Sequence, residues 1–200
     1  MGSTPIYSIP FADPTDIVRD WPGLSEDVAE AVEAAISGVP VLAGMGSNVV
    51  QTVKTDTFST TSATFENITG LAVTITPTSS SSKLLVIANI NISVSNTNMG
   101  CSVRLDGGGT ENFVGDAEGS RTRAFAFQSR TDASFESHRM TFVASVVALT
   151  SPNTTDAVTI NAQMLRSAAG TAFVNRSGED IDAARWARTV STITAIEVAA

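Results

Sequence analysis

Apolar and polar side chains alternate with a period of two along most of the chain from residue 49 onward. In an extended strand that period places successive side chains on opposite faces, so the pattern predicts β-structure. Clusters of Gly, Ser, Asn and Pro separate the alternating segments, as is typical of turns. We expect about eight to ten strands. The alternation is clearest in 71–76, 83–95, 124–128, 135–149, 158–164 and 191–199.

The segment "KLLVIANINISVS" at 83–95 predicts the longest strand. Its apolar residues change parity, because Leu85 and Ile87 give way to Ile90 further along. A one-residue slip of this kind exchanges the two faces of a strand. The slip predicts a bulge or bend near residues 88–89.

Many strands without helical segments between them favour an antiparallel jelly roll or β-sandwich. We assign it to residues 51–200, after a glycine-containing linker at 39–50. The run "DGGG" predicts the turn of a hairpin at Asp106–Gly109. No Lys-Ser/Thr pair follows the glycines, so they do not form a phosphate-binding loop.

One amphipathic helix is expected before the strands, at 24–37 within a segment bounded at 23–38. Ser25 is a suitable N-cap, and Gly38 provides the stop. An isolated helix of this length is marginal in water, so its apolar stripe needs a partner. We predict a trimer neck formed by Leu24, Val28, Ala31, Val32, Ala35 and Ile36.

Residues 1–22 predict an extended arm, because prolines are spaced too closely there for a helix. The arm also carries more large apolar groups than a flexible tail requires. Two interpretations stay open: the arm lies in a groove of another protein, or it folds back on its own domain. On the first, the expected contacts are Pro5, Ile6, Tyr7, Ile9, Pro10, Phe11 and Trp21.

Charge and composition narrow the function. The formal net charge is −8, which disfavours nucleic-acid binding. The longest apolar run, "LLVIA", is too short to span a membrane. The N-terminus shows no basic and apolar regions of a signal peptide, so we expect synthesis in a host cytoplasm without secretion.

No catalytic or cofactor-binding pattern is evident, so we expect neither an enzyme nor a cofactor. His138 has no second ligand at metal spacing, and Cys101 fits a buried small residue. The acidic residues at 179–182 lack the spacing of a calcium loop, so no metal is expected. Trp186, close by, is a candidate contact residue.

Two passages resemble small structural fibre proteins of tailed bacteriophages. They are "TPIYSIPFADPTDIVRDWPGLSEDVAEAVEAAI" and "KTDTFSTTSATFENITGLAVTITPTSSSSKLLVIANINISVS", and the closing "STITAIEVA" is similar to the last strand of such head domains. The resemblance implies a homotrimer with a jelly-roll head of the tumour-necrosis-factor or C1q type. It also implies a virion location, with the arm on other virion proteins.

The expected function is therefore a non-enzymatic tail fibre or minor tail protein, whose β-domain faces outward and either binds a host-surface glycan or decorates the particle. A capsid decoration or head fibre protein has the same parts and is the first alternative. A glycan-degrading tail enzyme is the second, and the acidic residues show no spacing that indicates it. A cellular C1q-like binding module is a third, disfavoured by the missing signal peptide.

Overall fold

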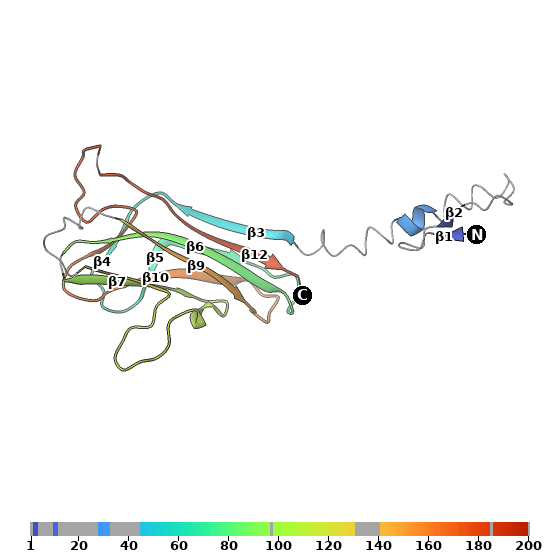
Figure 1. Ribbon diagram of the computed structural model, residues 1–200, viewed down its shortest axis with the longest axis horizontal. Coiled ribbons are helices and arrows are strands. Elements are labelled where there is room, and N and C mark those ends of the chain that lie inside the picture. The colour runs from blue at the N-terminus through green and yellow to red at the C-terminus, as the bar shows by residue number, and fades with distance from the viewer. Residues whose placement is uncertain are drawn as a thin grey trace. The chain divides into compact units, whose positions relative to one another are not determined.

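The computed structural model divides the chain into two units, Met1–Met45 and Gly46–Ala200. The second is called the β-unit below, and it contains the sheets that make up most of the fold (Figure 1). The structure describes residues 2–3, 10–11, 28–32, 45–96, 98–130, 141–184 and 186–199.

The described part of the first unit holds a short strand pair and a helical segment. Strand β1 (Gly2–Ser3) pairs antiparallel with β2 (Pro10–Phe11). Residues 28–32 are helical, inside the predicted range 24–37. The remaining residues of that predicted helix lie outside the described ones.

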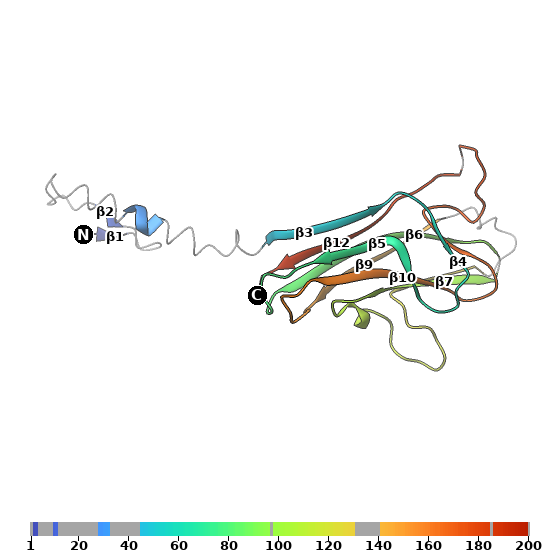
Figure 2. The ribbon, with the colours of Figure 1, turned by 180° about the vertical axis from the view of Figure 1, so that it is seen from behind.

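The β-unit is an antiparallel β-sandwich, in agreement with the predicted fold class. One sheet has the strand order β5 (Glu66–Ile75), β10 (Val158–Arg166), β7 (Met99–Asp106) and β8 (Ala126–Arg130). The other has the order β3 (Met45–Lys54), β12 (Ser191–Val198), β6 (Lys83–Val94), β11 (Ala172–Val174) and β4 (Phe58–Thr60), with β9 (Phe142–Thr150) paired to β6. Seen from behind, the two layers run along each other (Figure 2).

The core lies between the two sheets and comes from the inward positions of the alternating strands. Burial of each large aliphatic side chain contributes roughly 1.5–3 kcal/mol to folding. The predicted alternation is correct in β5 and β10, whose apolar positions face inward. Fully or almost fully buried residues from these two strands are Leu71, Val73, Ile75, Ile160, Ala162 and Met164.

The predicted bulge in the long strand near residues 88–89 is wrong. Strand β6 pairs with β9 in one unbroken register from Leu84 to Ile92, and its even-numbered positions face inward throughout. Leu85 and Ile87 instead point to the outer face of the sheet. The register between β5 and β10 does break, and Gly70 in that stretch of β5 has a φ of 78°, a conformation that glycine adopts without strain.

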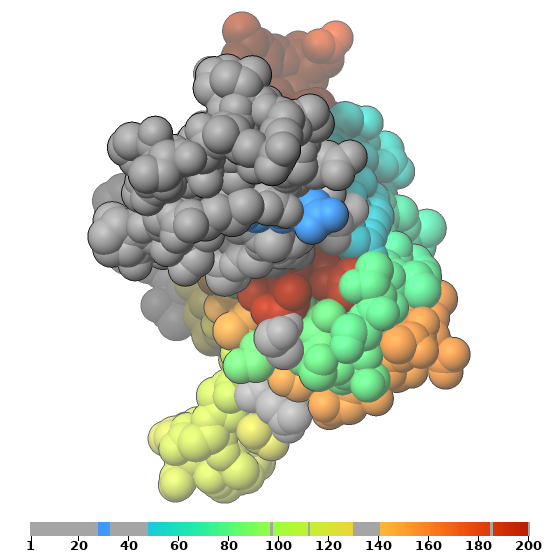
Figure 3. All heavy atoms as spheres, turned by 90° about the vertical axis from the view of Figure 1, so that its right-hand side faces the viewer, coloured from blue at the N-terminus to red at the C-terminus, as the bar shows by residue number. Residues whose placement is uncertain are grey.

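The hairpin prediction is correct for the turn and wrong for the strand expected directly after it. Thr110 donates its backbone N–H to the Gly107 carbonyl at 3.1 Å, closing the turn. A 3-10 helix, η2 (Thr110–Asn112), follows instead of a strand, and the chain returns to β7 only with β8. The intervening loop, coloured yellow-green, projects away from the rest of the β-unit (Figure 3).

The predicted strand at 135–149 is described only from residue 141 onward. Residue 141 is outside the strand and β9 starts at Phe142, while 131–140, with His138, lie outside the described residues.

Candidate binding surfaces

A long loop, 175–190, interrupts what would otherwise be one continuous strand. β11 pairs with β6 at Ile92–Val94, and β12 pairs with the same edge of β6 at Lys83–Asn89. The two short strands therefore lie end to end, and the loop leaves the sheet between them. It projects at the end of the β-unit opposite the C-terminus and the start of β3 (Figure 1).

Asn175 pins the base of this loop from a completely buried position. Its side-chain amide donates to the carbonyls of Lys54, at 2.7 Å, and Asp56, at 3.0 Å. Its Oδ1 accepts a hydrogen bond of 2.6 Å from the Ser191 hydroxyl. A buried polar side chain is costly unless it is hydrogen-bonded, and these three bonds pair the Asn175 amide. They join β3, β11 and β12 at one point.

Asn91 of β6 completes the base. Its backbone carbonyl accepts from the Asn175 N–H at 3.0 Å, and its side-chain amide donates to the Val190 carbonyl at 2.6 Å. Both residues begin N-x-S/T sequons, yet both side chains are used inside the fold. These two asparagines therefore hold the base of the loop.

Charged side chains shape the outer part of the loop. Asp180 lies 2.6 Å from the Arg188 guanidinium and 3.3 Å from that of Arg176. Arg176 in turn lies 4.2 Å above the centre of the Phe173 ring, a cation–π contact. One carboxylate thus ties the two ends of the loop to each other.

A cavity of about 240 Å³ opens in this loop. Its lining combines an indole with two carboxylates and a guanidinium, which suits a polar ligand with an apolar face. The sequence pointed to Trp186 here, and the structure places it in the cavity. The lining residues are Asp180, Ile181, Asp182, Ala183, Trp186 and Arg188.

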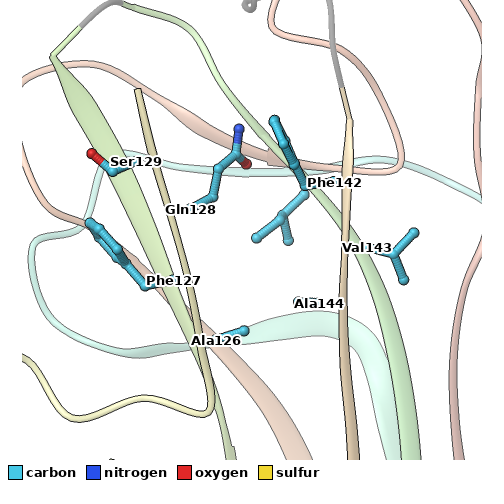
Figure 4. A pocket seen from close by; sticks show the side chains of 8 residues that line it. Ala126, Phe127, Gln128, Ser129, Phe142, Val143 and Ala144 are labelled. Atoms are coloured by element: carbon cyan, nitrogen blue, oxygen red, sulfur yellow. The ribbon is translucent and has the colours of Figure 1, made fainter. Parts of the chain in front are cut away.

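A second cavity, of about 260 Å³, lies between the edge strands β8 and β9. Gln128 and Phe142 lie between the two strands, whereas Phe127 and Val143 point away from them (Figure 4). Gln128 and Ser129 supply hydrogen-bonding groups to this cavity, and its other described lining residues are apolar.

The two titratable groups with the clearest shifts hold the fold together. Burial raises the pKa of the Cys101 thiol to about 12. Burial also raises the pKa of Glu197, but hydrogen bonds from Ser82, Thr78 and Asn48 outweigh it and lower the net pKa to about 2. Glu197 joins β12 to the β5–β6 turn, and Cys101 is a buried core residue, as predicted.

The predicted anchor residues lie mostly beyond the described positions. Pro10 and Phe11 form β2. The anchor contacts outside the described residues are Pro5, Ile6, Tyr7, Ile9 and Trp21.

Half of the predicted neck is described. Val28 and Ala31 are half-buried within the helical segment, and Val32 is 38% exposed. Leu24, Ala35 and Ile36 lie outside the described residues. The neck itself stays a prediction.

The part of the chain that the structure describes contains no cluster of three or more His, Cys, Asp or Glu side chains suited to a metal ion. Among the same residues, no helix has the length and apolar character needed to cross a membrane.

Comparison with known proteins gives structural likenesses only. No family model and no curated protein matches the chain. Structures of infectious bursal disease virus resemble it: the Gt strain at a TM-score of 0.40 and 11% identity, and the Gx strain at 0.36 and 16%. Each match covers 76% of this chain but only 38% and 36% of the viral chains, respectively. TM-scores this low do not establish a common fold, so the function proposed below rests on the chain's own residues.

Proposed function

We propose that the chain is a non-enzymatic structural protein of a bacteriophage virion, a homotrimeric tail fibre or minor tail protein. The observation that carries the proposal is that the two ends of the β-unit differ. The chain enters β3 and ends at one end of the sandwich, while the pinned loop 175–190 projects at the other (Figures 1 and 2). A domain that is attached at one end and carries a projecting loop at the other suits an outward-facing head.

Residues 1–22 anchor the protein to other virion proteins in this proposal. Their large apolar side chains need a surface to cover them, and their prolines favour an extended conformation. Three arms gathered in a trimer would bind a repetitive particle with avidity, without high affinity for each arm.

The helical segment supplies the trimer neck. Val28 and Ala31, three residues apart, are less exposed than Ala29 and Glu30 between them. Residues at this spacing share one face of a helix. Three copies of a short Ala/Val stripe can bury one another where a single copy is only marginally stable.

Loop 175–190 is the proposed host-facing element, and its cavity suits a sugar. The indole of Trp186 offers an apolar face to a pyranose ring, and Asp182 and Arg188 offer hydrogen bonds to its hydroxyls. Trp186→Ala should then lower adsorption to host cells at least tenfold. Phe127→Ala, which removes an exposed aromatic ring elsewhere, is the matched control.

Co-sedimentation with virus particles tests the proposed function. Full-length chain should sediment with particles that lack their own copy, and a chain without residues 1–22 should stay in the supernatant. Equal sedimentation of both chains would remove the anchoring role of the arm. Failure of the full-length chain to sediment would contradict a virion role.

The same design separates the alternatives. A capsid decoration or head fibre protein would bind particles without tails, whereas a tail protein would not. A glycan-degrading tail enzyme would shorten host polysaccharide in the presence of the purified chain alone.

A further inference from the structure

The outer face of the larger sheet is uncharged and mostly apolar along neighbouring strands β12, β6 and β9. Residues at equivalent positions of these strands form rows across the sheet. Leu85 lies between Ile196 and Leu149 in one row, and Ile87 lies between Thr194 and Val147 in the next. We define the outer face by Leu85, Ile87, Asn89, Val143, Ser145, Val147, Leu149, Thr192, Thr194 and Ile196.

The most exposed part of the outer face is on β9. Val143 is 61% exposed, Val147 is 67% and Leu149 is 49%. Single exposed apolar residues are ordinary, but several in line along one strand are typical of a surface that another molecule covers. Among the described strands, β9 pairs only with β6.

The outer face continues without charge onto β3. The Gln51 side chain donates to the Thr194 hydroxyl at 2.9 Å, which places it beside β12 on this face. Val49 and Val53, two residues away on either side, are 53% and 50% exposed. Lys83, at the beginning of β6, lies beyond the last apolar row and marks the rim.

We infer that the outer face packs against a second copy of this chain, which in the proposed homotrimer means that three outer faces meet around the common axis. The inference rests on the proposed function, because it names the surface through which the proposed trimer assembles. It is distinct from the neck, which belongs to the other unit of the chain.

The lack of charge on the outer face favours a second copy as the occupant. The chain carries a net charge of −8, so two copies repel each other across most of their surfaces and approach each other most easily where a face is uncharged. A basic partner would require acidic residues on the outer face, and none of the residues that define this face is acidic. An anionic membrane would be met by several basic residues, and the face offers only Lys83 at its rim.

The size of the outer face agrees with this occupant. Together with its continuation on β3, the outer face spans four strands at ~4.8 Å spacing, and over about seven residues of ~3.4 Å each these cover roughly 450 Å² of flat sheet. Protruding side chains make the accessible area larger than this flat area. The flat area alone is therefore more than half of the ~800 Å² that each partner contributes to a standard protein interface.

Thiol reactivity tests the inference in the full-length chain. Val147→Cys places a thiol on the outer face, and Ile181→Cys, at a residue that is 49% exposed in loop 175–190, is the control. The native Cys101 is buried and gives little background. In an isolated chain Val147→Cys should react at least as fast as the control, since Val147 is the more exposed.

We expect Val147→Cys to react at least tenfold more slowly than Ile181→Cys at concentrations where the wild type is oligomeric. The protection should disappear on dilution to the monomer. Equal reactivity in the oligomer overturns the inference while leaving a trimeric virion protein intact. Protection that persists in the monomer also overturns it, because the chain's own residues then cover the face.

A second variant gives an independent readout. Val147→Glu places one added negative charge per chain around the common axis, and these like charges repel one another. It should weaken association of the full-length chain at least tenfold, as measured by light scattering. Ile181→Glu is the control. A wild type that is monomeric at every concentration would contradict the homotrimer of the proposed function as well as this interface.

Discussion

The Ser191 hydroxyl donates a 2.6 Å hydrogen bond to Oδ1 of Asn175, across the base of loop 175–190. This bond joins the residue that follows β11 to the first residue of β12. Both residues are completely buried, so water does not compete for the bond. A long surface loop therefore has a fixed base where it leaves the sheet.

Replacing Asn175 should destabilise the β-unit. Asn175→Ala leaves the carbonyls of Lys54 and Asp56 without their donors and keeps a φ of 61° that alanine disfavours. We expect a loss of roughly 2–4 kcal/mol in the free energy of unfolding, measured with urea. Asn153→Ala is the control, because Asn153 has a φ of 54° but is exposed, and it should cost about 1 kcal/mol. Equal losses for the two variants would show that backbone strain, not the hydrogen bonds, dominates at Asn175.

Glu197 should make stability depend on acid pH. Its pKa is about 2 in the fold, against 4.5 for an ordinary glutamate, so the folded state binds fewer protons than the unfolded state between those values. Stability from this group is fully present above pH 4.5 and is lost as pH falls toward 2. Glu197→Gln should be less stable than the wild type at neutral pH, and the difference should shrink over this window in urea titrations. A pH-independent difference would contradict the role of the carboxylate.

Cys101 should be inert in the native protein. Burial raises its pKa to about 12, so almost no reactive thiolate forms at pH 8. An aromatic disulfide reagent should label it only after unfolding in guanidinium. Rapid labelling of the native chain would mean that the core around β7 opens.

Gly107 should resist substitution. Its φ is 104°, and a side chain there would collide with the backbone carbonyl of Thr159 on β10. Gly107→Ala should lower the free energy of unfolding by about 2 kcal/mol or more. Gly115→Ala, with open space around it, should be nearly neutral in the same urea series. If both substitutions are neutral, the turn after β7 adapts more easily than its packing indicates.

The sequence predicted those features that depend on neighbours in the chain. Val73 and Ile160 alternate with polar residues and lie in the core, because one face of each strand is buried. Leu85 and Ile87 were misleading, since an apolar outer face looks the same as an inner one in the sequence. The role of Asn175 depends on Lys54, far from it in the chain, so no local pattern indicates it.

Electron microscopy of gold-labelled chain on purified virus particles tests the virion role most directly. Label should appear at the tail, and it should be lost when residues 1–22 are deleted. Label on the head instead would select the capsid decoration or head fibre alternative. Particles that carry no label at all, from a chain shown to be folded by the protection of Cys101, would contradict the account.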